Sequence, residues 1–289
     1  MQIGIGLPSA VAGVTGNRLV EWAATADQGP FSSLGVVDRV VQQNWEPMVT
    51  LAAAAAVTKR VRLMPTVLLL PLRGAGMLAK QAASVDALSH GRLSLGLGIG
   101  GREDDYLATP TEFRQRGAKF EHGLELMKRI WNGEPPVAGI DPVGPKPVQP
   151  GGPEIILGAS SPVALQRIGR LGYAFMSGGG GPSRAKTNFD IVMEHRQAAG
   201  HPGKPRFVAL SYFGIDQAAI DSTVAGLKIW YRFMGPIADT MAQSFPNTPD
   251  AIREIIKQFE ETGVDELVFY SGSDDIHEMD RLSDLIGTI

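Results

Sequence analysis

The chain has 289 residues, of which 44% are hydrophobic and 20% are charged, proportions typical of a folded globular protein. Its formal net charge of −3 gives no support for nucleic-acid binding, which favours a clustered basic face. Because the chain has no cysteine, disulfide frameworks, thiolate zinc sites, iron–sulfur clusters and cysteine nucleophiles are excluded.

The first residues, MQIGIGLPSA, resemble a strand and not a signal peptide, because no basic segment precedes a long apolar run. The most apolar windows, residues 51–57 and 61–70, fall short of the roughly 18–20 apolar residues of a membrane span. We therefore expect a soluble cytoplasmic protein without membrane association.

Up to residue 131, short apolar runs alternate with longer amphipathic or alanine-rich runs, a pattern that predicts strands and helices in turn. The predicted strands span residues 2–7, 33–37, 62–69 and 92–97. The predicted helices span residues 17–26, 47–58, 77–88 and 113–131.

Five prolines among the sixteen residues 138–153 interrupt the alternation, which then resumes, so this segment is predicted to be a long surface loop and not a domain linker. Further strands are predicted at residues 154–157, 173–177, 207–213 and 266–270. Helices are predicted at residues 162–171, 185–199 and 276–286, together with a mostly helical stretch at 217–261 broken at Pro236 and Pro246.

Eight strand–helix units are compatible with a closed (β/α)8 TIM barrel or with a doubly wound open sheet. The count of eight favours the barrel, as one α/β domain over residues 1–289 with inserted loops and extra helices. In such a barrel the active site lies at the carboxyl ends of the strands.

The predicted strand ends are rich in glycine and poor in catalytic side chains, which indicates a bound cofactor whose own atoms carry the chemistry. Residues 96–101 match G-x-G-x-x-G, but three βα units precede them, so close approach of backbone to a ligand is favoured over a Rossmann motif, with a plain glycine-rich turn as the alternative. Residues 177–181 precede a helix with Arg184 and Lys186, which is typical of a phosphate site or, alternatively, of a flexible loop.

The other polar patterns in the sequence are weaker indications of a functional site. The five histidines lack metal-ligand spacing, and no predicted strand end has one, so no metal site is expected and a metal-dependent hydrolase is disfavoured. The acidic run at 103–105 is typical of a solvated helix start. The aromatic stripe at 230–234 is interpreted as core or dimer packing, with a pocket wall as the alternative.

Several segments resemble one known family. Residues 88–98, LSHGRLSLGLG, resemble the LDxLSxGRxxLGxGxG signature of luciferase-like flavin-dependent oxidoreductases. Residues 102–106, the pair Glu46-Pro47 and the segment 58–63 are also similar. The resemblance covers most of the chain, is strong up to Trp131 and is poor between residues 214 and 247.

This resemblance implies a barrel with FMN or the deazaflavin coenzyme F420 lying over the strand ends. Asp38 matches an acidic residue that contacts the ring, and Thr66-Val67 matches a non-proline cis peptide that supports it. The implied cofactor-binding residues are Gly6, Asp38, Thr66, Val67, Gly98, Gly100, Gly101, Arg102, Gly158, Ala159, Ser160, Gly178, Gly179 and Gly180.

The chain departs from the family's pattern at two places. Sugar-phosphate dehydrogenases of the deazaflavin branch carry Asp-His after strand two, whereas this chain has Asp38-Arg39, which argues against that activity. The family's Asp-Gly pair at strand six is replaced here by residues 172–175. Asp38 and Arg39 are the catalytic candidates, and Arg39 would stabilise negative charge that develops on the ring.

The resulting hypothesis is an oxidoreductase that acts on a small organic substrate, either as an FMN-dependent monooxygenase or as an F420-dependent reductase or dehydrogenase. The alternative is a luciferase-like barrel that binds flavin, or nothing, without catalysis. Because the family often pairs barrels through helices near the early strands, a homodimer is expected.

Overall fold

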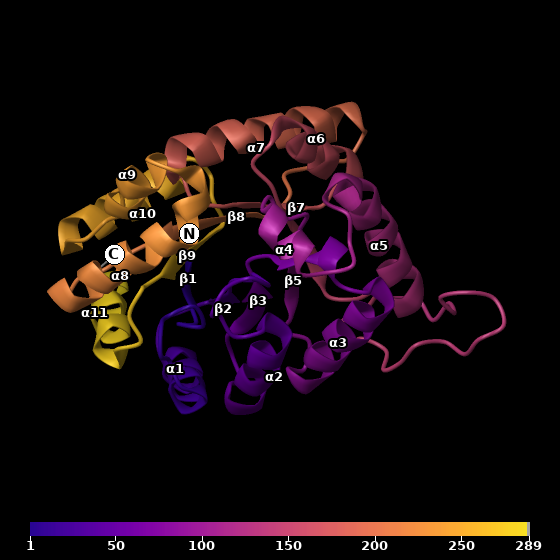
Figure 1. The fold of residues 1–289 in the computed structure, drawn as a ribbon, viewed down its shortest axis with the longest axis horizontal. Helices are drawn as coiled ribbons and strands as arrows, with labels where there is room; N and C mark the ends of the chain where they lie inside the picture. Colours follow the sequence, from indigo (N-terminus) through magenta and orange to yellow (C-terminus); the bar gives the residue numbers. More distant parts are fainter. Residues whose placement is uncertain (288–289) are drawn as a thin grey trace.

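The computed structural model describes residues 1–287 of the chain. Its strands are all parallel and form one sheet with the order β3-β2-β1-β9-β8-β7-β6-β5-β4 (Figure 1). The strands are β1 (Gln2–Gly6), β2 (Ser33–Val36), β3 (Arg62–Pro65), β4 (Leu68–Leu69), β5 (Ser94–Gly98), β6 (Glu154–Gly158), β7 (Ala174–Ser177), β8 (Phe207–Tyr212) and β9 (Glu266–Tyr270).

The two ends of this order belong to one continuous segment, the strand predicted at residues 62–69. β3 pairs with β2 and β4 pairs with β5, and an isolated bridge joins Leu63 to Leu93 just before β5. The sheet therefore closes into a barrel of eight strand positions, as predicted. The prediction of one unbroken third strand was wrong, because β3 ends at Pro65, which has no N–H to donate to a neighbouring strand, and β4 begins only at Leu68. The peptide bond between them, Thr66-Val67, is cis, as the family resemblance implied.

Helices surround the barrel, and the segment 138–153 projects outward beside α5, without helix or strand, as predicted (Figure 1). The α-helices are α1 (Gly16–Gln28), α2 (Pro47–Val57), α3 (Ala75–Leu88), α4 (Glu103–Leu107), α5 (Arg116–Trp131), α6 (Pro162–Leu171), α7 (Gly181–Ala198), α8 (Gln217–Tyr231), α9 (Ile237–Gln243), α10 (Pro249–Glu261) and α11 (Ile276–Ile286). The 3-10 helices are η1 (Leu70–Leu72), η2 (Phe113–Gln115) and η3 (Arg232–Met234).

Proline and glycine set the ends of the helices near the mouth of the barrel. α7 begins four residues before its predicted start, because Gly180 takes a left-handed conformation and Pro182 lies in the first turn, where a missing N–H costs nothing. The predicted breaks at Pro236 and Pro246 are confirmed, since Pro236 precedes α9 and Pro246 lies between α9 and α10.

Two large side chains fit into the barrel because glycines face them. A Cβ atom on Gly6 would overlap the ring of Tyr270, and one on Gly35 would overlap its hydroxyl. A Cβ on Gly98 or Gly158 would lie 2.6 or 2.9 Å from the methyl groups of Val67. Tyr270 and Val67 therefore occupy volume that the missing side chains leave free.

A partly buried charge cluster lies at the opposite end of the barrel. Arg206 forms ion pairs with Glu154 of β6 and Glu266 of β9, and Ser33 of β2 donates a hydrogen bond to Glu266 (2.6 Å). Although burial opposes it, the two carboxylates raise the pKa of the Arg206 guanidinium. These polar contacts therefore link β2, β6 and β9 at the residues where the three strands begin.

Within residues 1–287, no helix has both the length and the apolar character that crossing a membrane requires. The prediction of one domain over residues 1–289 stays a prediction.

We expect Gly6→Ala to lower the free energy of unfolding by about 1–3 kcal/mol, because the added methyl group must displace the Tyr270 ring from a packed interior. Gly226→Ala is the control, since this helical glycine has open space around it and alanine there should stabilise by up to about 1 kcal/mol. Urea denaturation measures both. Equal stabilities of the two variants would show that the Tyr270 contact is unimportant.

Candidate active site

A cavity of about 670 Å³ lies on one side of the barrel mouth, at the carboxyl ends of β1, β2, β8 and β9. The loops after β1 and β2 form one wall, α8 forms the other, and Tyr212 and Tyr270 lie between them. Trp230, in the last turn of α8, also lines the cavity, so the aromatic stripe includes a pocket wall. A cavity of this size lies within the range of small-molecule sites, about 300–1,000 Å³.

Asp38 lies two residues after β2, and its carboxylate is fully engaged by protein groups. It accepts hydrogen bonds from the Leu69 amide (2.9 Å) and from Arg73 (3.0 and 3.1 Å), and Arg73 also pairs with Glu46 (2.6 Å). Burial raises the pKa of the Asp38 carboxyl despite the opposing charge of Arg73. Asp38 thereby fixes the loop after β2 to the segment that follows the cis peptide.

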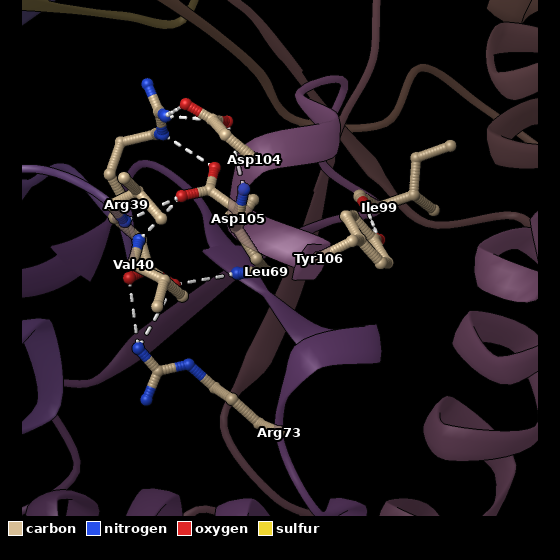
Figure 2. Close-up of polar contacts among 10 residues, drawn as sticks. Arg39, Val40, Leu69, Arg73, Ile99, Asp104, Asp105 and Tyr106 are labelled. Atoms are coloured by element: carbon tan, nitrogen blue, oxygen red, sulfur yellow. Dashed lines mark hydrogen bonds and ion pairs between the residues drawn. The ribbon is translucent and has the colours of Figure 1, made fainter. Parts of the chain in front are cut away.

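Arg39 points into a carboxylate pair on α4, as Figure 2 shows. Its Nε donates to Asp105 (2.6 Å), and its Nη2 donates to Asp104 (2.9 and 3.0 Å). Asp105 also accepts from the backbone amides of Val40 and Val41 (2.9 Å each). Sequence reasoning interpreted the acidic run as a solvated helix start; α4 does begin there, but Asp105 is buried and holds the loop after β2.

Arg102, which precedes α4, has a guanidinium group surrounded by aromatic rings from α8 and η3. Its Cζ lies 4.3 Å from the ring centroid of Phe233, 5.2 Å from that of Trp230 and 5.9 Å from that of Tyr231. Its Nη1 is buried and has no hydrogen-bond partner. A buried cationic donor without a partner is costly, so this group is suited to an anionic ligand.

The glycine-rich turn after β7 lies beside the same aromatic cluster. A Cβ on Gly179 would lie 3.7 Å from the Tyr231 hydroxyl, whereas one on Gly178 would have open space around it. Gly180 adopts φ +119°, and the long helix α7 starts directly after it, with Arg184 packed against Gly180. Backbone amides at such a helix start are suited to bind a phosphate group.

The other predicted glycines fall into two groups. Gly6, Gly98 and Gly158 have the packing role described above, which accounts for glycine there without a ligand. Gly100 adopts φ +71°, and Gly101 is exposed with open space around it.

After β6, Ala159 packs partly against the core, and Ser160 is exposed. The sequence-predicted residues thus lie at the strand ends, but not all of them face open space.

Three tyrosines lie at the mouth, of which sequence reasoning selected only Tyr231, as part of the aromatic stripe. The Tyr270 hydroxyl is hydrogen-bonded to Thr66, and the Tyr212 hydroxyl lies 3.0 Å from the Tyr231 hydroxyl. Burial raises the pKa of all three phenols, which therefore stay protonated at neutral pH. The available signal was position, because Tyr212 and Tyr270 lie at or next to the predicted ends of their strands.

We expect Asp105→Ala to lower the free energy of unfolding by about 3 kcal/mol, because it leaves Arg39 and two amides with lost partners in a buried site. Asp104→Ala is the matched control: its side chain is 44% exposed against 2% for Asp105, so the expected loss is below about 1 kcal/mol. Chemical denaturation compares the two. Losses of equal size would contradict the structural role of Asp105.

Comparison with known proteins gives three informative relatives. A protein of Mycobacterium tuberculosis (strain H37Rv) is 29% identical over 220 residues, which are 70% of this chain and 74% of that protein. The F420-dependent glucose-6-phosphate dehydrogenase of Nocardia farcinica is 24% identical and covers 93% of this chain and 91% of its own length. The 4-hydroxyprotoasukamycin monooxygenase of Streptomyces nodosus subsp. asukaensis is 29% identical over 75% of this chain and 62% of that protein.

The fold also matches solved structures. The oxygenating constituent of 3,6-diketocamphane monooxygenase from Pseudomonas putida, solved with FMN, superposes with a TM-score of 0.78 and 21% identity over 99% of this chain and 96% of that one. A profile of the luciferase-like monooxygenase family matches residues 1–275. The chain therefore belongs to the luciferase-like monooxygenase family.

Proposed function

We propose that this protein is a flavin- or deazaflavin-dependent oxidoreductase that acts on a small organic substrate at the barrel mouth. The observation that carries this proposal is the buried, unpartnered Nη1 of Arg102 on one side of the mouth, with a neutral cavity on the other side. A cationic donor without a partner suits the anionic part of a cofactor, and the cavity suits a substrate.

The residues of the mouth fit a phosphate-bearing cofactor with a planar ring. Gly178 to Gly180 and the start of α7 would bind the phosphate through backbone amides, and Arg102 would add a charged donor. Thr66-Val67 would support the ring from below. When bound, the cofactor supplies the redox chemistry, while these residues position it.

We propose that Asp38 and Arg39 act at this site from positions that their ion pairs fix. Arg39 lies with its guanidinium carbon 5.8 Å from the ring centroid of Trp230, which itself lines the cavity. Its ion pairs with Asp104 and Asp105 would hold the guanidinium beside this cavity wall, so that Arg39 acts through its position. Asp38 would act through the loop geometry that its bonds to Arg73 and Leu69 impose.

One observation favours the alternative of a barrel that binds a cofactor without catalysis. Both catalytic candidates are occupied by protein partners, Asp38 by Arg73 and Arg39 by Asp104 and Asp105. Reduction of the bound cofactor followed by its reoxidation, with small ketones or oxygen added, separates the two functions. The catalytic proposal requires reoxidation to be faster than that of the free cofactor.

We expect purified protein to bind F420 or FMN, followed by fluorescence titration with each cofactor in turn. Arg102→Gln should weaken that affinity by roughly 10- to 100-fold, because hydrogen bonds to charged groups contribute about 1.5–3 kcal/mol. Arg253→Gln on the exposed face of α10 is the control and should leave the affinity unchanged.

The identity of the cofactor that binds distinguishes between two kinds of enzyme. Binding of F420 alone, weakened by Asp38→Ala, supports a hydride-transfer enzyme, and binding of FMN alone supports a monooxygenase or an FMN reductase. If neither cofactor binds below roughly 100 μM, which corresponds to about −5.5 kcal/mol, the proposed function is wrong.

We also propose that two copies of the chain pair through α2. This helix contains no charged residue, and its Val49 and Val57 are 63% and 39% exposed. Met77 of the neighbouring α3 is 62% exposed. Exposed apolar side chains gathered on adjacent helices are typical of an interface between subunits.

Light scattering coupled to size-exclusion chromatography should give twice the chain mass for the unmodified protein and the single-chain mass for Val49→Glu, because a buried charge without a partner opposes association. Val163→Glu on α6, where the valine is 68% exposed, is the control and should not change the mass. A monomeric unmodified protein would contradict the proposal.

A further inference from the structure

The cavity beside α8 has a neutral lining, which limits the substrates that it can take. Its wall combines aliphatic groups such as Leu7, Val37 and Leu227 with the amides of Gln42 and Asn44. Among the lining residues that the structure describes, Arg232 alone carries a charge, and its side chain is exposed to solvent, where water and salt screen it.

The other cations near this cavity are paired with carboxylates. Arg39 is paired with Asp104 and Asp105, and Arg73 is paired with Asp38 and Glu46. A phosphate or carboxylate in the cavity would therefore lose its hydration and find no cation except the solvent-screened Arg232. An uncharged ligand with an apolar body has no such cost and gains from contact with the apolar wall.

Counting the hydroxyl hydrogens of the tyrosines and the acceptors that they reach identifies one free donor for this ligand. The Tyr270 hydroxyl is hydrogen-bonded to the Thr66 hydroxyl, which also lies within hydrogen-bond distance of the Val36 carbonyl (3.3 Å), so Tyr270 already has a protein partner. The Tyr212 and Tyr231 hydroxyls bond only to each other within residues 1–287. This pair has two hydrogens and uses one, so one remains available.

The available hydrogen lies next to the cavity, because Tyr212 lines it. When Tyr231 donates to Tyr212, the Tyr212 hydroxyl keeps its hydrogen for a ligand. Burial raises the pKa of Tyr212 well above its ordinary value, so the phenol keeps its hydrogen at physiological pH and can donate it to a ligand.

We propose that the substrate is an uncharged, largely apolar molecule whose oxygen atom accepts a hydrogen bond from Tyr212, and that phosphorylated and carboxylated molecules are excluded from this cavity. This inference rests on the proposed function, because it places the substrate beside the cofactor-binding half of the mouth. Beyond the proposed function, it specifies the class of substrate and names Tyr212 as the residue that selects it.

The test uses two probes of the same shape, cyclohexyl methyl ketone and cyclohexanecarboxylate, titrated calorimetrically into the full-length protein at pH 7.5. We expect the ketone to bind at least tenfold more tightly than the carboxylate. Tyr212→Phe should weaken ketone binding by roughly five- to tenfold, the usual effect of losing one hydrogen bond to a neutral group. Ala225→Trp, which fills the cavity, should abolish ketone binding.

Tyr231→Phe is the matched control, because it removes the other phenol of the pair and leaves the Tyr212 hydrogen free. Its ketone affinity should stay within twofold of that of the unmodified protein. The inference is overturned if the carboxylate binds as tightly as the ketone, if Tyr231→Phe and Tyr212→Phe have equal effects, if Ala225→Trp retains binding, or if neither probe binds below about 10 mM.

Titration with F420 and FMN, run separately, distinguishes this failure from failure of the proposed function. Cofactor binding without the ketone preference overturns only the substrate class. A ketone preference without binding of either cofactor overturns the oxidoreductase and leaves the neutral cavity as a binding site.

Discussion

The steric fit between two large side chains and four glycines is the constraint on which the mouth of the barrel depends. Tyr270 lies against Gly6 and Gly35, and Val67 lies against Gly98 and Gly158. Protein interiors are close-packed, so neither side chain has room if a neighbour gains a Cβ atom. The hydroxyl of Tyr270 then reaches Thr66, which ties the last strand of the barrel to the interrupted third strand.

This packing divides the mouth into two halves with different electrostatics. On one side, Arg102 and the amides before α7 offer donors to an anion. On the other side, the cavity wall is uncharged except for the exposed Arg232, and the nearby Arg39 and Arg73 are paired with carboxylates. Trp230 of α8 both lines the cavity and lies beside Arg102, so this helix contributes to both halves. The division suits a reaction between a charged cofactor and an uncharged substrate.

The sequence predicts the barrel well, because the strands are local apolar runs and because proline or glycine marks helix ends such as those near Gly180, Pro236 and Pro246. It predicts the site less completely, because the decisive contacts join distant residues. Arg39 and Asp105 are 66 positions apart, and an acidic helix start has the same pattern whether it is solvated or buried. Pro65, directly before the split of the third strand, is a break signal that the prediction of one strand passed over, whereas only the family resemblance pointed to the cis peptide at Thr66-Val67.

Asp38 and Arg39 illustrate how the chemical role of a charged residue follows from its partners. Both stand where a catalytic pair is expected, yet protein groups already satisfy them, so their main effect is to fix the loop after β2. The groups left for ligands are those that the protein does not satisfy. At the mouth they include the Arg102 Nη1, the Asn44 Oδ1 and one hydrogen of the Tyr212–Tyr231 pair. A buried polar atom without a partner is costly in the folded chain, so the unsatisfied atoms indicate the ligand better than the residue types do.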